Sequence, residues 1–286
     1  GRHEPNAMLT GAPVIWRDRV IVPVSAVDVA RAAAPNYECC KSHGAVVALK
    51  AADGSRLWAA HTMEDAKPTG QKNSAGANLW GPSGAAVWSS PAIDEKRGVI
   101  YVGTGQNTSL PATKTSDSIW AIDARTGQTK WFFQALERDV FTMACPRGAN
   151  CPSPQDSALK DFDFGAAVII GKDAKGKDLL LGGQKSADVW ALTPDGKVVW
   201  NRKLGVGSAL GGVHWGMASD GKALYVPIAD RGGAGIHALN VATGDVLWSH
   251  KAAPDCGAGR QERVPYCQRG FSMSAAPMVV DGAVLA

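Results

Sequence analysis

The sequence predicts an all-β fold built from repeated antiparallel hairpins, because it states one phrase four times. Each copy has an apolar run ending in Ala-Leu or Ala-Ile, a turn ending in glycine and a short strand closing on tryptophan. The runs are too short for helices, and the glycine marks a position where the backbone needs a positive φ. The copies span 46–58, 119–131, 189–200 and 236–248. Four copies indicate one supersecondary unit used repeatedly.

A second predicted hairpin precedes each copy, at 13–25, 90–105, 165–182 and 217–228. Two consecutive hairpins make a four-stranded sheet, which is one blade of a β-propeller. A fifth hairpin opens at Ser274, and the sequence ends inside it. Because four blades and a part do not close a ring comfortably, we expect residues 1–286 to be one segment of a larger propeller.

Four tryptophans, Trp58, Trp131, Trp200 and Trp248, close the copies of the phrase. They are 73, 69 and 48 residues apart (131−58, 200−131 and 248−200). The first two separations exceed the roughly 40 to 50 residues usual for a blade. The surplus lies in segments around 60–82 and 143–163, which are predicted to be long loops of the kind that carry function. The four tryptophans themselves are expected to pack between neighbouring blades.

Composition narrows the possible functions. The 286 residues include 33 glycines and 10 tryptophans, which favours many short strands joined by turns. The formal net charge is +4 and the 30 Lys and Arg residues are dispersed, so we expect no nucleic-acid partner. No apolar stretch approaches the ~20 residues needed to cross a bilayer. No signal peptide is recognised, although Gly1 is not a natural start and the beginning could be missing.

Six cysteines fall into three local pairs: Cys39 with Cys40, Cys145 with Cys151 and Cys256 with Cys267. No pair has the spacing of a zinc site, and no CxxCH haem-attachment motif is present. Each pair lies in a segment between predicted strands. Disulfides are therefore favoured over free core thiols, and disulfides indicate an oxidising compartment such as a periplasm.

The repeated phrase resembles the tryptophan-docking repeat of quinoprotein dehydrogenases, eight-bladed propellers that hold pyrroloquinoline quinone (PQQ) on their axis. Cofactor-free propellers of the outer-membrane assembly machinery carry similar repeats. The segments between the repeats resemble the polyvinyl-alcohol-dehydrogenase-like branch, in the same order over nearly the whole chain. They are VPVSAVD at 22–28, YECCKSHGAVVAL at 37–49, GPSGAAVWSSPAID at 81–94, VGTGQN at 102–107, DVFTMAC at 139–145, DFDFGA at 161–166, GQKSADVWAL at 183–192 and GGVHWGMASDG at 211–221.

This resemblance implies a set of residues around the quinone. Trp88 matches the tryptophan that forms a flat floor beneath the cofactor, although it could be a further docking tryptophan. Lys185 matches the cation that stabilises charge on the quinone oxygens, although a lone lysine is usually solvated. His214 and Trp215 match residues lining the pocket. His214 stands where the family has Glu or Asn, so it either bonds a cofactor carboxylate or fills space.

Two further contacts with the cofactor are implied, by Ser25 and by the adjacent pair Cys39 and Cys40. Methanol-oxidising relatives hold a disulfide between neighbouring cysteines against the quinone face. Here the pair follows VPVSAVD in a different blade context. It is therefore either a cofactor contact or an ordinary loop staple.

The metal site departs furthest from the family pattern. Family enzymes hold calcium with a Glu, an Asn and an Asp. Asp28 and Gln106 stand where the Glu and Asn are expected, and Asn107 is next to Gln106. Thr142 stands at the position of the catalytic base and third ligand, where a hydroxyl alone is a poor base. Asp139 is the nearby carboxylate, although a turn or cap aspartate is the more frequent use.

The sequence therefore supports two hypotheses from different classes. The first is a periplasmic, PQQ- and calcium-dependent dehydrogenase that oxidises a secondary or polymeric alcohol by hydride transfer and passes electrons to a cytochrome c. The second is a non-catalytic propeller scaffold that binds proteins through its rim loops. The altered ligand set favours the second, and the extended family resemblance favours the first.

Overall fold

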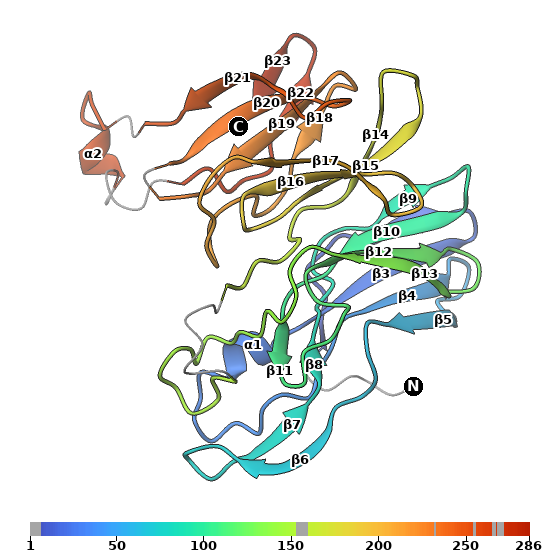
Figure 1. The fold of residues 1–286 in the computed structure, drawn as a ribbon, viewed down its shortest axis with the longest axis vertical. Coiled ribbons are helices and arrows are strands. Elements are labelled where there is room, and N and C mark those ends of the chain that lie inside the picture. Colours follow the sequence, from blue (N-terminus) through green and yellow to red (C-terminus); the bar gives the residue numbers. More distant parts are fainter. Residues whose placement is uncertain (1–6, 153–159, 232, 254–255, 265–266, 268–271) are drawn as a thin grey trace. The chain divides into compact units, whose positions relative to one another are not determined.

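The computed structural model describes residues 7–152, 160–231, 233–253, 256–264, 267 and 272–286. The chain forms two compact units, Gly1–Val168 and Ile169–Ala286. Antiparallel four-stranded sheets dominate each unit, and the two helices among the described residues have four residues each (Figure 1). The prediction of an all-β fold with four-stranded blades is confirmed. The assignment of residues 1–286 to a single propeller segment stays a prediction.

The first sheet of unit 1 joins the first pair of expected hairpins. It contains β2 (Val14–Trp16), β3 (Arg19–Ala26), β4 (Ala45–Lys50) and β5 (Arg56–His61), and β1 (Ala7–Met8) pairs with the end of β3. The connection from β3 to β4 includes the single turn α1 (Asp28–Arg31). This connection holds several predicted site residues.

The second sheet of unit 1 contains β9 (Ala92–Asp94), β10 (Val99–Gly103), β12 (Ser118–Asp123) and β13 (Thr129–Gln134). Two ribbons lie outside the sheets: β6 (Lys67–Lys72) with β7 (Asn78–Gly81), and β8 (Ser83–Gly84) with β11 (Asn107–Ser109). The expected loop at 60–82 therefore contains a hairpin, whose turn forms because Asn73 Oδ1 accepts the N–H groups of Ala75 and Ala77. Part of the other expected loop, 153–159, lies outside the described residues.

Unit 2 repeats this plan. Its first sheet contains β14 (Ile169–Lys172), β15 (Asp178–Gly183), β16 (Asp188–Leu192) and β17 (Val198–Lys203). Its second contains β18 (Ala218–Ser219), β19 (Ala223–Ile228), β20 (Gly235–Asn240) and β21 (Val246–Lys251). The helical turn α2 (Arg260–Arg263) follows, and β22 (Met278–Val280) pairs with β23 (Ala283–Leu285) as the fifth expected hairpin.

All four copies of the phrase fold in the same register. The closing tryptophan is the cross-strand partner of the alanine in each apolar run: Ala48 with Trp58, Ala121 with Trp131, Ala191 with Trp200 and Ala238 with Trp248. A register shift follows directly in every copy. The turn glycines have φ values of 71°, 74°, 84° and 72°, which confirms the predicted left-handed backbone.

Two of these tryptophans pack onto the turn glycine of the next copy within their own unit. A Cβ added to Gly127 would lie 2.7 Å from the Trp58 ring, and one added to Gly244 would lie 2.6 Å from the Trp200 ring. Trp200 Nε1 also donates a hydrogen bond to the carbonyl oxygen of Val241 at 3.1 Å. The predicted packing of closing tryptophans between blades is therefore confirmed for these two. Trp248 remains 45% exposed and lies beside Tyr225.

The core of unit 1 lies between its two sheets. Its buried members come from both, including Trp16 and Ile21 of the first sheet and Trp120 of the second, with Trp58 packed against them. The Trp120 and Phe132 rings stack with centroids 5.1 Å apart. Because each aromatic side chain buries roughly 150 to 250 Å², these rings provide much of the apolar contact between the sheets.

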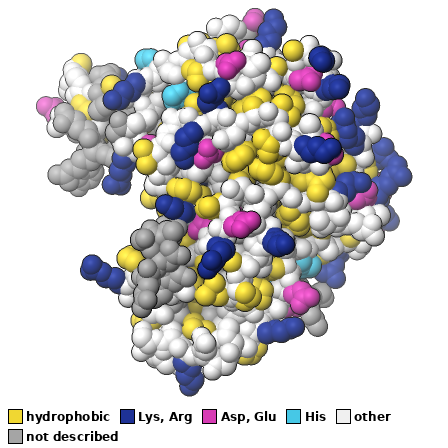
Figure 2. Space-filling view, viewed as in Figure 1, with side chains coloured by type: hydrophobic (Ala, Val, Ile, Leu, Met, Phe, Trp, Pro, Cys, Tyr) yellow, Lys and Arg dark blue, Asp and Glu magenta, His cyan; other side chains and the backbone are white. Residues whose placement is uncertain are grey.

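The three cysteine pairs are disulfides, Cys39–Cys40, Cys145–Cys151 and Cys256–Cys267, as predicted. Neither helix in the described part of the chain is long and apolar enough to span a bilayer. Lysine and arginine side chains are spread over the face shown in Figure 2, with acidic side chains among them. This distribution agrees with the dispersed basic residues of the sequence.

Candidate functional site

Trp88 lies at a point in unit 1 where three chain segments meet. Its indole Nε1 donates a hydrogen bond to Asp163 Oδ2 at 3.1 Å, and the backbone N–H of Gln106 donates to Asp163 Oδ1 at 2.9 Å. The Gly105 N–H bonds the Ala86 carbonyl at 2.9 Å, which ties the segment carrying Trp88 to the segment carrying Gln106. Asp163 is buried, whereas Trp88 is only half-buried. The carboxylate therefore fixes the plane of a partly accessible indole.

Gly105 leaves room for this arrangement. A Cβ at this position would lie 3.1 Å from the carboxylate carbon and both carboxylate oxygens of Asp163. The absence of a side chain thus allows the carboxylate to lie directly against the backbone. Asp163 comes from the DFDFGA segment, and Asp161 two residues earlier is also buried.

Asp139 is held by backbone donors of the same segment. Its carboxylate accepts N–H groups from Phe162 at 2.8 Å, Asp161 at 3.1 Å and Lys160 at 3.4 Å. Burial raises the pKa of Asp139, and these backbone hydrogen bonds oppose the rise. Its role as a base stays a prediction, because the carboxylate is already committed to organising the 160–162 segment.

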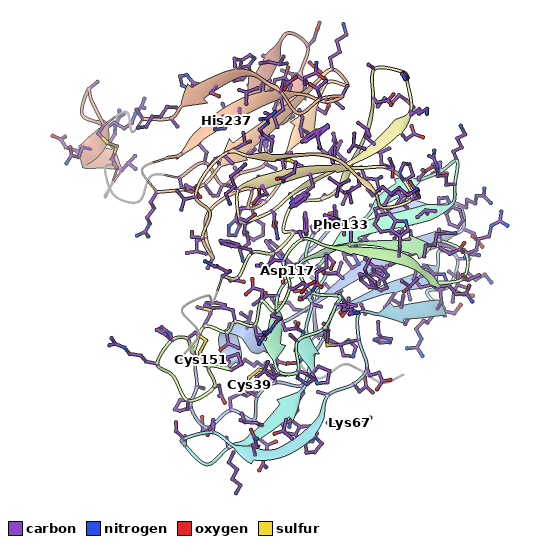
Figure 3. All side chains as sticks on the ribbon, in the orientation of Figure 1. Cys39, Lys67, Asp117, Phe133, Cys151 and His237 are labelled. Atoms are coloured by element: carbon purple, nitrogen blue, oxygen red, sulfur yellow. A yellow bond between two sulfur atoms is a disulfide. The ribbon has the colours of Figure 1, made fainter. Side chains whose placement is uncertain are left out.

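Asp117 is a fourth buried acid in this region, just before β12 (Figure 3). Neither of its carboxylate oxygens has a hydrogen-bond partner. Its backbone N–H bonds the carbonyl of Gly105 at 3.0 Å, which places Asp117 beside the segment that carries Gln106. Burial, followed by the negative charges of Asp139 and Asp163, raises the pKa of Asp117 well above its usual range.

Asp28, the predicted calcium ligand, is fully buried and organises the connection between β3 and β4. Asp28 Oδ2 accepts the N–H of Lys41 at 2.8 Å, the N–H of Ser42 at 2.6 Å and the Ser42 hydroxyl at 2.6 Å. The Tyr37 hydroxyl donates to Oδ1. Burial and then the Asp28 carboxylate raise the pKa of Tyr37. The Asp28 carboxylate thus holds both ends of the segment that contains Cys39 and Cys40.

The other two predicted metal ligands lie on neighbouring segments. Gln106 Nε2 donates to the Phe141 carbonyl at 3.2 Å, and the Met143 N–H donates to the Val29 carbonyl at 2.9 Å. The structure therefore brings the segments carrying Asp28, Gln106 and Thr142 together. Thr142 Oγ1, however, donates to the Asn150 carbonyl at 3.1 Å. Asn107 Nδ2 likewise donates to the Ser83 carbonyl at 3.1 Å.

These contacts test how well the named donors fit a calcium ion. Asp28 Oδ2 is surrounded by N–H and O–H donors, and Thr142 Oγ1 donates a hydrogen bond to a backbone carbonyl. No group of three or more His, Cys, Asp or Glu side chains in the described residues could hold a metal ion. A calcium site formed by Asp28, Gln106 and Thr142 stays a prediction, and no chemical step is derived through it.

The adjacent disulfide is buried in a small cluster with Ala32, Ala144 and Cys151. Figure 3 shows Cys39 and Cys151 near α1. Asn150 supports the cluster by donating to the carbonyls of Ala34 and Tyr37 at 3.0 and 3.1 Å. This packing matches the loop-staple interpretation, and the cofactor contact stays a prediction. Ser25, at the buried end of β3, also stays a predicted contact.

Lys185, His214 and Trp215 belong to unit 2. Lys185 is buried, and its carbonyl accepts the N–H of Ser208 at 3.2 Å. A side chain on Gly212 would clash with the Lys185 backbone, so the 183–187 and 211–215 segments pack closely. The His214 and Trp215 rings have centroids 4.9 Å apart and line a cavity of about 1090 Å³. The structure therefore brings the segments carrying Lys185 and His214 together within unit 2.

Sequence reasoning assigned no role to Asp163 or to Asp117, two of the buried acids in unit 1. Asp163 lies in a quoted family segment, but no role was assigned to it. The available signal was the Asp-x-Asp spacing of Asp161 and Asp163, because alternate residues of an extended segment share one face. Asp117 carries no comparable signal, since its neighbours Ser116 and Ser118 suggest an exposed turn.

Comparison with known proteins identifies the family. Residues 1–151 match the family described as "Glucose/ethanol/alcohol dehydrogenase, beta-propeller domain". Residues 176–285 match the family described as "Outer membrane protein assembly factor BamB". The chain is 40% identical to a polyvinylalcohol dehydrogenase of Sphingopyxis sp. (strain 113P3), over 99% of this chain and 44% of that protein. It is 36% identical to one from Pseudomonas sp., over 87% of this chain and 40% of the relative.

Solved structures support the same fold. The quinohemoprotein alcohol dehydrogenase of Comamonas testosteroni superposes with a TM-score of 0.59 at 15% identity, over 86% of this chain and 47% of that one. The chain thus spans less than half the length of these relatives. The family match over residues 1–151 and the close relatives agree with the propeller sheets of the structure. The chain therefore belongs to the PQQ β-propeller dehydrogenase family.

Proposed function

We propose that the chain is the part of a PQQ-dependent alcohol dehydrogenase that supplies the floor of the quinone site. The proposed substrate is a secondary alcohol or a polyvinyl-alcohol-like polymer. One observation carries the proposal: the half-buried indole of Trp88 is held by the buried Asp163 carboxylate. The identity of 40% to a polyvinylalcohol dehydrogenase over 99% of the chain supports the substrate class.

The residues around Trp88 fit the planar ring of the cofactor in one respect that the structure displays. An indole whose edge is hydrogen-bonded cannot rotate freely, so its face is pre-organised as a flat apolar surface. Gly105 leaves room for the carboxylate that holds it. Bound PQQ would supply the hydride acceptor for alcohol oxidation. Trp88 would bind the ring, and Asp163 would orient Trp88.

Both oxygens of Asp163 already accept hydrogen bonds, from the Trp88 indole and the Gln106 backbone, so we assign Asp163 the positioning of Trp88 and no role as a base. Asp139 and Thr142, the bases predicted from sequence, are each hydrogen-bonded to local backbone groups and keep that role only as a proposal. Lys185 keeps its proposed role of stabilising negative charge on the cofactor oxygens.

Three further parts of the proposal concern the compartment, the electron acceptor and the metal. Three disulfides support an oxidising compartment, and we propose the periplasm. We propose a cytochrome c as electron acceptor because the family resemblance implies one. Calcium is retained as a proposed cofactor on the same ground, without assigned ligands.

Titration of the purified chain with PQQ, followed by tryptophan fluorescence and visible absorbance, tests the proposal. We expect saturable quenching at micromolar PQQ. Trp88→Leu, which removes the aromatic face, should weaken the affinity for PQQ about tenfold. Trp248→Leu, which removes an exposed docking tryptophan, is the matched control and should leave the affinity unchanged. Absence of quenching at micromolar PQQ, with or without calcium, would overturn the proposal.

A non-catalytic scaffold is the second candidate, favoured by the match of residues 176–285 to an outer-membrane assembly factor. In this case the rim segments would bind proteins and the Trp88 region would only stabilise the fold. The same titration distinguishes the two candidates. Absence of quinone binding would favour the scaffold, whereas a quinone that binds but is not reduced by a secondary alcohol would indicate a cofactor site that has lost its activity.

A further inference from the structure

The 204–210 segment of unit 2 presents large apolar side chains to solvent from a tightly built loop. Val206 is 83% exposed and Leu210 is 73% exposed, and Trp215 on the adjoining segment is 54% exposed. Isolated exposed apolar residues are normal, but several around one cavity mark a binding surface. These three side chains line the cavity of about 1090 Å³ together with His214.

A buried carboxylate holds this loop in shape. Asp230 accepts the N–H groups of Val206 at 2.6 Å, Gly207 at 3.0 Å and Gly212 at 2.7 Å. A side chain on Gly211 would meet Asp230 Oδ1 at 2.5 Å, so the glycine permits the close approach. Because the backbone is tied at three points, Val206 is displayed by a pre-organised loop, which lowers the entropic cost of binding.

The lining of the cavity combines apolar, hydroxyl and charged groups. Val206, Leu210 and Trp215 supply apolar surface, whereas Ser208, Ser272 and Ser274 carry hydroxyls. Arg231 and Asp230 also line the cavity, and the Asp230 carboxylate accepts backbone N–H groups of the loop. The volume of about 1090 Å³ lies just above the roughly 300–1,000 Å³ typical of ligand sites, which suits a segment of a chain molecule better than one small alcohol.

We propose that this cavity binds a stretch of a hydroxylated aliphatic polymer, with Val206 and Leu210 contacting its methylene groups and the serines bonding its hydroxyls, while His214 and Trp215 keep their proposed place beside the cofactor. The inference rests on the proposed function for its substrate class. It goes further by assigning polymer binding to the 204–210 segment of unit 2, whose backbone is hydrogen-bonded to Asp230. A chain that alternates CH₂ and CHOH groups offers both kinds of contact at every repeat. A small secondary alcohol cannot reach both kinds of contact along the cavity, so the cavity discriminates by substrate length.

Calorimetric titration of the 286-residue chain with polyvinyl alcohol oligomers, in the absence of PQQ, tests polymer binding independently of catalysis. We expect saturable binding that Val206→Ser and Leu210→Ser each weaken about fivefold to tenfold, as partial loss of an apolar contact would. Ile15→Ser is the matched control, because Ile15 is 72% exposed but lies in unit 1. It should bind as the unmodified chain does.

Four outcomes would overturn the assignment. The first is absence of saturable binding, and the second is equal weakening by Ile15→Ser. The third is equal binding of polyethylene glycol, which lacks hydroxyls along the chain and would show that binding does not depend on them. Self-association removed by Leu210→Ser would identify a second copy as the occupant and would also overturn it. Polymer binding without quinone binding would sustain this inference while the proposed enzyme activity fails.

A kinetic measurement on the PQQ-loaded full-length protein separates the two proposals further. Val206→Ser and Leu210→Ser should raise KM for the polymer about fivefold to tenfold and leave KM for a small secondary alcohol unchanged. An equal rise for both substrates would contradict a length-selective site.

Discussion

Trp88 and Asp163, 75 residues apart in the chain, are joined by a hydrogen bond of 3.1 Å from the indole nitrogen to a carboxylate oxygen. The bond links Trp88, which is predicted to lie beneath the cofactor, to an acid that had no role assigned from the sequence. It also makes the buried Asp163 necessary for the orientation of Trp88. Several consequences of this and related contacts can be measured.

Asp163→Ala should destabilise unit 1 and weaken PQQ binding. The substitution leaves the Trp88 indole N–H and the Gln106 backbone N–H without their acceptor, at a cost of about 1–3 kcal/mol for each buried donor. Urea unfolding would measure the loss, and fluorescence titration would measure PQQ affinity. Asp195→Ala, at an exposed turn, is the control and should change stability by less than about 0.5 kcal/mol. Equal effects of the two substitutions on stability and on PQQ affinity would contradict the role of Asp163 in holding Trp88.

Asp117→Asn should stabilise the protein increasingly as pH rises. The folded pKa of Asp117 is raised above its ordinary value of 3.8, so above pH 3.8 the folded state binds more protons than the unfolded state. Wild-type stability is therefore lost as pH rises from 3.8 towards the raised pKa, and Asn, which does not titrate, avoids this loss. Urea midpoints of both proteins between pH 4 and pH 8 check the sign. A difference that shrinks with pH would mean that Asp117 is ionised and stabilised by an unseen partner.

Gly127→Ala should cost more than the same change at Gly54, although both glycines occupy the same place in the repeated phrase. Both have positive φ, 74° and 71°, so each alanine costs about 1–2 kcal/mol for left-handed backbone. The added Cβ at Gly127 also meets the Trp58 ring at 2.7 Å, whereas nothing lies within 4 Å at Gly54. Overpacking adds about 1–3 kcal/mol, which urea unfolding would resolve. Similar losses at the two positions would contradict the docking of Trp58 on Gly127.

Asp28→Asn should destabilise the protein to the same extent with calcium and with a chelator. The carboxylate accepts two N–H groups and two hydroxyls, and an amide group cannot accept all of them. We expect a loss of about 1–3 kcal/mol for each buried donor left unpaired. Thermal unfolding in calcium and in EGTA measures this. A larger loss in calcium than in EGTA would instead support the metal-ligand role predicted from the family resemblance. Ser42→Ala, which removes one hydroxyl donor and leaves the carboxylate, should cost about 1 kcal/mol in both conditions.

Much of the architecture could be predicted from the sequence because it depends on residues near one another in the chain. Turn glycines, alternating apolar residues and closing tryptophans specify each hairpin over about a dozen residues, and all four copies share one register. The three disulfides also join cysteines close in sequence, at separations of 1, 6 and 11 residues. The hairpin at 67–81 was missed because its first strand, β6, is mostly polar and is exposed along its whole length.

The site was decided by tertiary structure, because hydrogen-bond partners and burial depend on how strand ends from distant segments meet. The sequence named Trp88, Asp28, Gln106 and Lys185 as residue types suited to a quinone and a metal. Only the fold showed that Asp28 is committed to the Cys39–Cys40 segment and that Asp163 holds Trp88. Only the fold revealed Asp117 as a buried acid without a hydrogen-bond partner. A carboxylate looks the same in a sequence whether it meets water, a backbone amide or another carboxylate, and its chemistry depends on which of these it meets.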